Sequence, residues 1–123
     1  MNDNRLIFEA YLQESDEQPE LNVSPRGDRF WRLDGLYHRE DGPAVEWTNG
    51  TKLWYRNGLR HREDGPAAEY NTGGKIYCLN DVKYPTIEKY AAAVLKLHNK
   101  EVTSESIRDF VRQILSKQAQ NFI

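Results

Sequence analysis

The sequence predicts an α+β fold, in which an antiparallel β-meander built from 23-residue, two-stranded repeats is followed by a C-terminal helical hairpin. The heptad His-Arg-Glu-Asp-Gly-Pro-Ala at residues 38–44 returns unchanged at residues 61–67. Asn-Gly and Asp-Gly pairs separate short aromatic and β-branched runs, which is typical of tight hairpins. After Pro85 the apolar residues change to helical spacing.

The repeat extends beyond the heptads. Trp31 aligns with Trp54 at the same offset, and a third, divergent copy begins at Lys75 with Tyr77 in the tryptophan position. A fixed period of this length is typical of proteins whose units bury their apolar faces against their neighbours, and most of these are binding scaffolds. Strand alternation puts one aromatic ladder on one sheet face and a second apolar ladder on the other. The two ladders are Trp31, Trp54 and Tyr77, and Phe30, Leu53 and Ile76.

We expect one folded domain with three parts. Residues 1–28 form an N-terminal segment and an acidic connector, residues 29–84 the repeats, and residues 85–123 a two-helix cap. Residues 5–12 fit a short helix or an edge strand equally well, and residues 13–26 are predicted to be a solvated connector. An open meander has edge strands. We therefore expect either dimerisation through an edge or cover of the first edge by residues 5–12.

Each helix of the cap is predicted from an apolar stripe. The stripes are Ile87, Tyr90, Ala91, Val94 and Leu95, and then Ile107, Phe110, Val111, Ile114 and Leu115, the second after an N-cap at Thr103 or Ser104. These stripes need a surface to cover. We expect them to cover part of an aromatic sheet face and to protect the end of the repeat stack.

Composition narrows the class of protein. The chain has 123 residues, a net charge of −2 and a single cysteine, Cys78, so an intramolecular disulfide is excluded. The cysteine usage favours a cytoplasmic location, and no signal peptide or membrane span is expected. The charges form no basic stripe of the kind that nucleic-acid binders carry.

The heptads are predicted to build turns, through His38, Asp41, Gly42 and Pro43 and their counterparts His61, Asp64, Gly65 and Pro66. We expect each histidine to bond within its own turn and each glycine to adopt an unusual φ. The two histidines should stand two strand spacings apart, roughly 9–10 Å, which is too far to share a zinc ion. No metal, cofactor or catalytic residue is predicted.

The charged heptad residues leave two interpretations open. Arg39 and Arg62 either stack on an aromatic ring or pair across repeats, or they form a partner-binding edge with Glu40 and Glu63. The candidate binding set is Arg39, Glu40, Arg62, Glu63, Arg56, Arg60 and Trp54. If these arginines contact a partner, reversing both heptad charges should abolish binding and leave the melting temperature nearly unchanged. Two helices cannot cover both aromatic faces, so the uncovered face is the best candidate contact surface.

The stretch at residues 52–61, Lys-Leu-Trp-Tyr-Arg-Asn-Gly-Leu-Arg-His, has an aromatic residue before a glycine turn and a histidine shortly after it. In this it resembles the MORN repeat. The Arg-Glu-Asp-Gly-Pro-Ala after His61 stands where the usual repeat has Gly-x-Gly. With its heptads and helical tail the chain is similar to small proteins of tailed bacteriophages. The resemblance covers residues 29–84 and implies protein or lipid contact rather than catalysis.

The sequence therefore predicts a non-enzymatic protein-binding module. The resemblance implies a phage-encoded inhibitor or modulator of a host protein or protein complex. An anti-CRISPR-type counter-defence factor in the host cytoplasm is one example. The alternative is a binder of nucleotides or single-stranded nucleic acid, in which Arg32, Arg56 and Arg60 contact phosphate beside aromatic rings.

Overall fold

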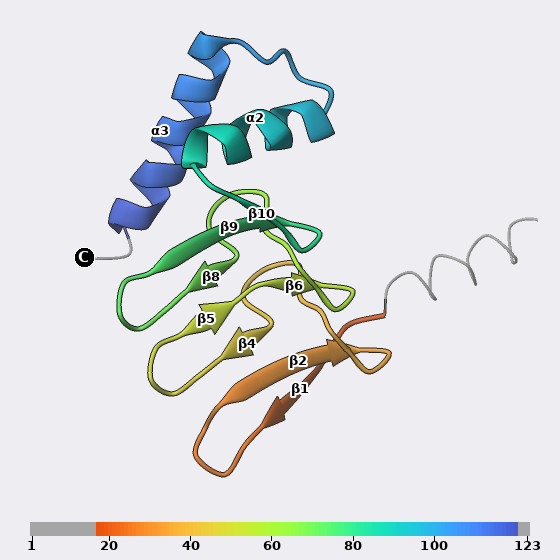
Figure 1. Cartoon of the computed structure of the whole chain (residues 1–123). Coiled ribbons are helices and arrows are strands. Elements are labelled where there is room, and N and C mark those ends of the chain that lie inside the picture. Colours follow the sequence, from red (N-terminus) through yellow and green to blue (C-terminus); the bar gives the residue numbers. More distant parts are fainter. Residues whose placement is uncertain (1–16, 121–123) are drawn as a thin grey trace, which may run out of the picture.

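The computed structural model describes residues 17–120, which form an antiparallel sheet followed by a helical hairpin, as predicted (Figure 1). The strands of the main sheet lie in the order β1-β2-β4-β5-β8-β9-β10, with β3 also paired to β2, and β6 and β7 pair separately. The elements are β1 Glu20–Val23, β2 Arg29–Leu33, β3 Leu36–Tyr37, β4 Val45–Glu46, β5 Lys52–Leu53, β6 Tyr55–Arg56, β7 Leu59–Arg60, β8 Ala68–Glu69, β9 Lys75–Leu79, β10 Val82–Tyr84, α2 Ile87–Leu97 and α3 Ser104–Gln120.

Each repeat is one hairpin whose second strand is interrupted by the heptad. In the first repeat β2 pairs with β3 and, further back along its length, with β4. The heptad at residues 38–44 lies between these two halves. The backbone of Trp31 holds both ends of the heptad segment, because its carbonyl accepts from His38 N and its N–H donates to Ala44 O. The same two bonds join Trp54 to the second heptad.

The hairpin turns follow the sequence prediction. Asp34-Gly35 and Asn57-Gly58 both have φ values of 52° and 79°, and Asn80-Asp81 has 48° and 69°. Positive φ at both central residues matches the twist of the flanking strands. These three turns lie on one side of the stack and the loops at residues 24–28, 47–51 and 70–74 lie on the other (Figure 1).

The predicted solvated connector is wrong for residues 20–23, which form β1 and pair with β2 along its length. The loop after β1 repeats the later loops bond for bond, since Gly27 N donates to Ser24 O as Gly50 N does to Trp47 O. Strand β1 therefore takes the place of the second strand of a repeat upstream of β2. It covers the edge of β2 that was expected to be covered by residues 5–12 or used for dimerisation, and residues 5–12 lie outside the described residues.

The helices cover only the end of the repeat stack (Figure 1). Leu79, Tyr90, Val94 and Ile114 form the buried cluster, against which Tyr77, Tyr84, Ile87, Ala93 and Phe110 pack. Thr86 caps α2 by accepting from Lys89 N, and Thr103 accepts from Ser106 N at the start of α3. Leu115, expected on the buried stripe, is 48% exposed because α3 has only the end of the stack to cover. In the described part of the chain, neither helix is long and apolar enough to cross a membrane.

Candidate functional site

The heptad arginines lie flat on the repeat tryptophans. The Arg39 guanidinium is 3.8 Å from the Trp31 ring centroid, and that of Arg62 is 4.0 Å from Trp54. A guanidinium over an indole face is attracted by the negative potential of the ring, more strongly when water is excluded. These side chains are only 22% and 16% exposed. We call this side of the sheet the heptad face.

Each of these guanidinium groups also donates to internal acceptors through Nε and one Nη atom. Arg62 donates to Asp64 Oδ1 at 2.9 Å, to Pro66 O at 3.0 Å and to Glu69 Oε2 at 2.9 Å. Arg39 makes the first two of these bonds with Asp41 and Pro43, and its contact with Glu46 is longer, at 3.9 Å. The heptad arginines therefore hold the heptad segments against the sheet and are engaged in internal contacts rather than available to a partner.

The heptad glycines do not adopt positive φ, contrary to the expectation from the sequence. The glycines with positive φ are Gly27, Gly35, Gly50, Gly58 and Gly73. A Cβ on Gly42 would instead lie 2.9 Å from Arg39 Cζ, and one on Gly65 would lie 2.8 Å from Arg62 Cζ. Glycine lets the guanidinium pack against the backbone, and a Cβ at this position would displace the end of the arginine side chain.

Both heptad histidines bond to the next repeat, and only His61 also bonds within its own heptad as expected, through Nε2 and Glu63 at 2.6 Å. His38 Nδ1 accepts from Asn57 N, and His61 Nδ1 accepts from Asn80 N, both at 3.0 Å. Both histidines are buried. Each therefore ties its repeat to the hairpin turn of the following one, which a fixed 23-residue period allows at every junction.

Tyr90 of α2 takes over from a missing heptad. The third repeat has no arginine to cover Tyr77, and the Tyr90 ring lies there instead, 4.9 Å between centroids. Its hydroxyl donates to Arg62 O at 2.5 Å and accepts from Gly65 N at 3.2 Å. The side chain is fully buried, so the cap is joined to the second heptad by both packing and hydrogen bonds.

Glu63 is the second junction between the cap and the repeats. Its carboxylate meets His61 Nε2 at 2.6 Å, His98 Nε2 at 2.7 Å and an Arg56 nitrogen at 3.1 Å. Burial by itself raises the pKa of Glu63, but the bonds from His61 and His98 and the Arg56 charge outweigh burial, so the pKa lies below its ordinary value. The equivalent Glu40 is 71% exposed and has only a 3.9 Å contact with His38.

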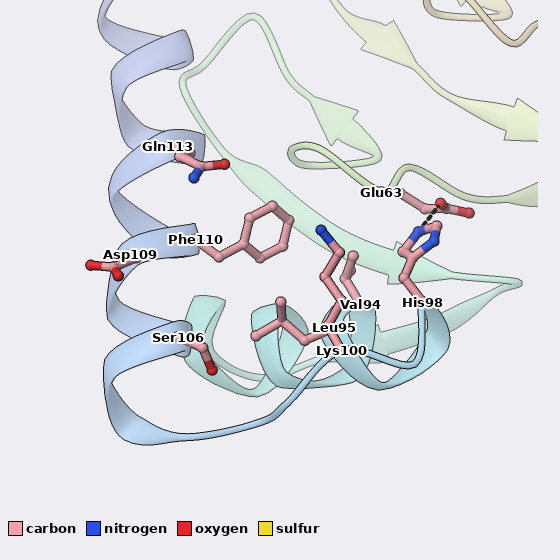
Figure 2. A pocket seen from close by; sticks show the side chains of 9 residues that line it. All are labelled: Glu63, Val94, Leu95, His98, Lys100, Ser106, Asp109, Phe110 and Gln113. Atoms are coloured by element: carbon pink, nitrogen blue, oxygen red, sulfur yellow. Dashed lines mark hydrogen bonds and ion pairs between the residues drawn. The ribbon is translucent and has the colours of Figure 1, made fainter.

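Beside this junction a hollow of about 450 Å³ opens between the two helices and the second heptad (Figure 2). Val94, Leu95 and Phe110 form its apolar part, and Glu63 and His98 close one end through their hydrogen bond. Glu63 is already held by three partners, and the other ionisable side chains that line the hollow beside His98 are Lys100 and Asp109, the latter 3.7 Å from Arg112. Among the residues that the structure describes, no group of His, Cys, Asp and Glu side chains has the arrangement of a metal site.

The opposite side of the sheet carries a different surface, which we call the open face. Phe30 contacts Trp47 edge-on at 5.4 Å, and Tyr37 lies 5.3 Å from Tyr55. Trp47 and its repeat counterpart Tyr70 are 41% and 36% exposed. The helices pack on Tyr77 and Leu79 of β9, whose side chains point to the heptad face, so they leave the open face uncovered.

One row of side chains crosses the open face from strand to strand. Arg32 is opposite Tyr37, Tyr55 is opposite Arg60, and Cys78 is opposite Lys83. Neighbouring pairs are joined by backbone bonds, Gly58 N to Tyr37 O and Asp81 N to Arg60 O. We call Arg32, Tyr37, Tyr55, Arg60, Cys78 and Lys83 the cross-strand row. The first repeat has arginine before tyrosine and the second has tyrosine before arginine. Both repeats therefore keep an arginine–tyrosine pair, although neither position keeps the same residue.

The candidate binding residues from the sequence divide between these regions. Arg39, Arg62 and Trp54 belong to the heptad packing, Arg56 and Glu63 to the junction with the cap, and Arg60 to the open face. Glu40 is exposed beside the first heptad. Asp41, Asp64, Pro43 and Pro66 serve as acceptors for the heptad arginines. Burial raises the pKa of the Cys78 thiol, which makes it a poor nucleophile.

Sequence reasoning missed Tyr37, Tyr90 and His98. The exchange of Arg32 and Tyr37 for Tyr55 and Arg60 at the 23-residue offset is visible in the sequence and indicates a retained pair. Tyr90 was assigned to the core without its role as a substitute for the heptad arginine. His98 carries no sequence signal, because its contact with Glu63 depends on where α2 ends.

Comparison with known proteins leaves the family open. No model of a protein family matches the chain, and neither a curated protein nor a solved structure matches it.

Proposed function

We propose that this protein is a non-enzymatic binding module that recognises another protein through the open face. The observation that carries the proposal is that the aromatic rings are covered by other side chains on the heptad face and exposed on the open face. The aromatic rings of the heptad face are capped by Arg39, Arg62 and Tyr90, whereas the open face leaves Trp47 and Tyr70 exposed at the same position of successive repeats. Exposed aromatic groups ordered by a rigid scaffold are typical of interface centres.

The resemblance to repeat proteins of tailed bacteriophages is the basis for proposing where this protein acts and what kind of partner it has. It suggests a phage-encoded inhibitor or modulator of a host protein, counter-defence of the anti-CRISPR type included, which acts in the host cytoplasm. The internal contacts of Glu63, Arg39 and Arg62 support binding over catalysis, since each of these groups is engaged in holding the fold.

The test is affinity capture from a bacterial lysate with two matched variants. W47A/Y70A removes exposed aromatic surface from the open face, and L97A/L115A removes comparable exposed apolar surface from the helices. We expect the wild type and L97A/L115A to retain one stoichiometric protein partner that W47A/Y70A loses, with similar melting temperatures for all three. Capture that is equal for both variants, or no stoichiometric partner across several hosts, would contradict the proposal.

A further inference from the structure

The open face and the heptad face treat their arginines differently. Each heptad arginine has two carboxylates within reach, whereas Arg32 and Arg60 form no ion pair with any carboxylate of residues 17–120. Arg32 donates instead to the Tyr37 hydroxyl at 3.2 Å, and Arg60 to the Tyr55 hydroxyl at 3.4 Å. Both guanidinium groups are thus held in position by tyrosines on a partly exposed surface and form no ion pair, although Glu20 lies opposite Arg32 on β1 and the Asp81 carboxylate accepts from the Arg60 backbone N–H.

The rings position these charges. The Arg32 guanidinium lies 4.8 Å from the Tyr37 centroid and 5.6 Å from Phe30, and that of Arg60 lies 5.8 Å from Tyr55. Stacking on a ring and bonding to a hydroxyl restrict a side chain that otherwise has many rotamers. Ordering before binding reduces the entropy lost when a partner arrives. Arginine also presents a planar fork suited to two-point contact with a carboxylate.

The positions along the cross-strand row set a spacing. Arg32 and Arg60 stand on strands three places apart, which is roughly 14 Å across the strands at ~4.8 Å per strand, and they are also offset along the strands because Arg39 N bonds Tyr55 O. Tyr37 and Tyr55 lie between them, and Lys83 continues the row two strands further on. The positive side chains of the row are Arg32, Arg60 and Lys83, with the aromatic pair between the first two, and the acidic Glu20 lies beyond Arg32 on β1.

We propose that the open face binds an acidic protein segment that lies along the cross-strand row and places carboxylates against Arg32 and Arg60. This rests on the proposed function and specifies the partner's chemistry. In an extended segment rising about 3.4 Å per residue, carboxylates four residues apart match the spacing of the two arginines. The side chain midway between them lies on the Tyr37–Tyr55 pair.

A nucleic-acid strand fits this surface less well. Bases stack on open ring faces. Here the faces of Phe30, Tyr37 and Tyr55 are already occupied by guanidinium groups or by a neighbouring ring. The chain as a whole carries a net charge of −2, so it offers no general attraction to a polyanion. On the open face, the positive side chains that would attract an acidic segment are those of the cross-strand row.

The experiment titrates the protein with two polyanions, a 15-residue poly-L-glutamate and a 15-nucleotide oligothymidylate, at low salt. The Nε–H signals of the arginines are followed by NMR. We expect poly-L-glutamate to shift the Arg32 and Arg60 signals and to bind at least about ten-fold more tightly than oligothymidylate. R32Q/R60Q should weaken poly-L-glutamate binding by about ten-fold or more, as the loss of two ion pairs predicts. R108Q, which removes an exposed charge from α3, should change it by less than about two-fold.

Three results would overturn the acidic-segment proposal. The first is equal shifts at Arg108 and Arg112, which would show non-specific attraction. The second is equal or tighter binding of oligothymidylate, which would favour a nucleic-acid ligand. The third is binding unchanged in R32Q/R60Q. None of these affects the capture test with W47A/Y70A, so the binding module stands or falls separately from the acidity of its partner.

Discussion

Both faces of the sheet carry arginines packed on aromatic rings, but only the heptad-face arginines also pair with carboxylates. On the heptad face, arginine, aromatic ring and carboxylate form closed units, with Arg62 in contact with Trp54, Asp64 and Glu69 at once. On the open face, the Arg60 guanidinium meets a tyrosine ring and hydroxyl but forms no ion pair within residues 17–120, and the nearby Asp81 carboxylate bonds only the Arg60 backbone N–H. A closed unit contributes to the stability of the fold and leaves nothing to offer a ligand. An arginine that is positioned but not neutralised contributes little to folding and remains available for recognition.

The largest expected effect comes from opening a closed unit. R62A leaves the partly buried Glu69 carboxylate without its cation, leaves Asp64 with Lys117 alone and exposes the Trp54 ring, so we expect a loss of about 2–4 kcal/mol in the free energy of unfolding. R39A should cost less, because its contact with Glu46 is longer. R60A on the open face should cost under ~1 kcal/mol. Urea unfolding of the three variants compares the faces directly, and equal losses would remove the distinction.

The next effect tests whether the helical cap completes the heptad face. Y90F retains the ring over Tyr77 but removes the hydroxyl that bonds Arg62 O and Gly65 N. Two backbone groups then lose a partner in a buried position, and we expect a loss of about 1–3 kcal/mol. Y84F is the control, since it removes a hydroxyl from the same cluster. A Y90F protein as stable as Y84F would mean that α2 is held by packing alone.

A smaller effect is expected from the heptad glycines. G65A places a methyl group where the Arg62 guanidinium lies, and we expect about 1 kcal/mol of destabilisation from its displacement. In the R62A background the same substitution should cost much less, because the obstructing group is gone. A double-mutant cycle by thermal melting measures this coupling. Independent effects would indicate that the backbone, rather than the arginine, requires glycine.

The smallest effect concerns pH. Because the pKa of Glu63 is lowered in the folded protein, its contribution to stability is present above its ordinary value of 4.5 and is lost as the pH falls through the folded value. E63Q should therefore be less stable than the wild type at pH 7, and the two melting temperatures should converge toward pH 3. E40Q, which alters the exposed counterpart, should show no such convergence. A constant gap between the wild type and E63Q across this range would exclude the linkage.

Much of the fold is predictable because the signals are local. Asn57-Gly58 specifies a tight turn whatever surrounds it, and the stripe from Ile87 to Leu95 specifies an amphipathic helix. Strand β1 was missed because Glu20 and Asn22 look solvated, and all four of its residues are indeed exposed. The signal that was overlooked is Gly27, which stands 23 residues before Gly50 and closes the same kind of loop.

The site was less predictable because its meaning lies in contacts between repeats. Arg39 and Arg60 have the same charge in the sequence, and only the packing shows that the first is neutralised by Asp41 and the second is not. The same reason led to the error over Gly42, where a close approach requires the glycine that turn statistics attribute to φ. Similarly, charge reversal at Arg39 and Arg62 is now expected to lower the melting temperature, not to leave it nearly unchanged.

The most direct test of the division between the two faces compares two matched double variants on the same samples. R32Q/R60Q and R39Q/R62Q each remove two positive charges, one pair from each face. For each variant the melting temperature is measured first and capture of the bacterial partner second. The division predicts that R32Q/R60Q melts within a few degrees of the wild type and loses the partner, while R39Q/R62Q melts far earlier. It would be contradicted if R32Q/R60Q kept the partner, or if R39Q/R62Q kept the wild-type melting temperature while losing it.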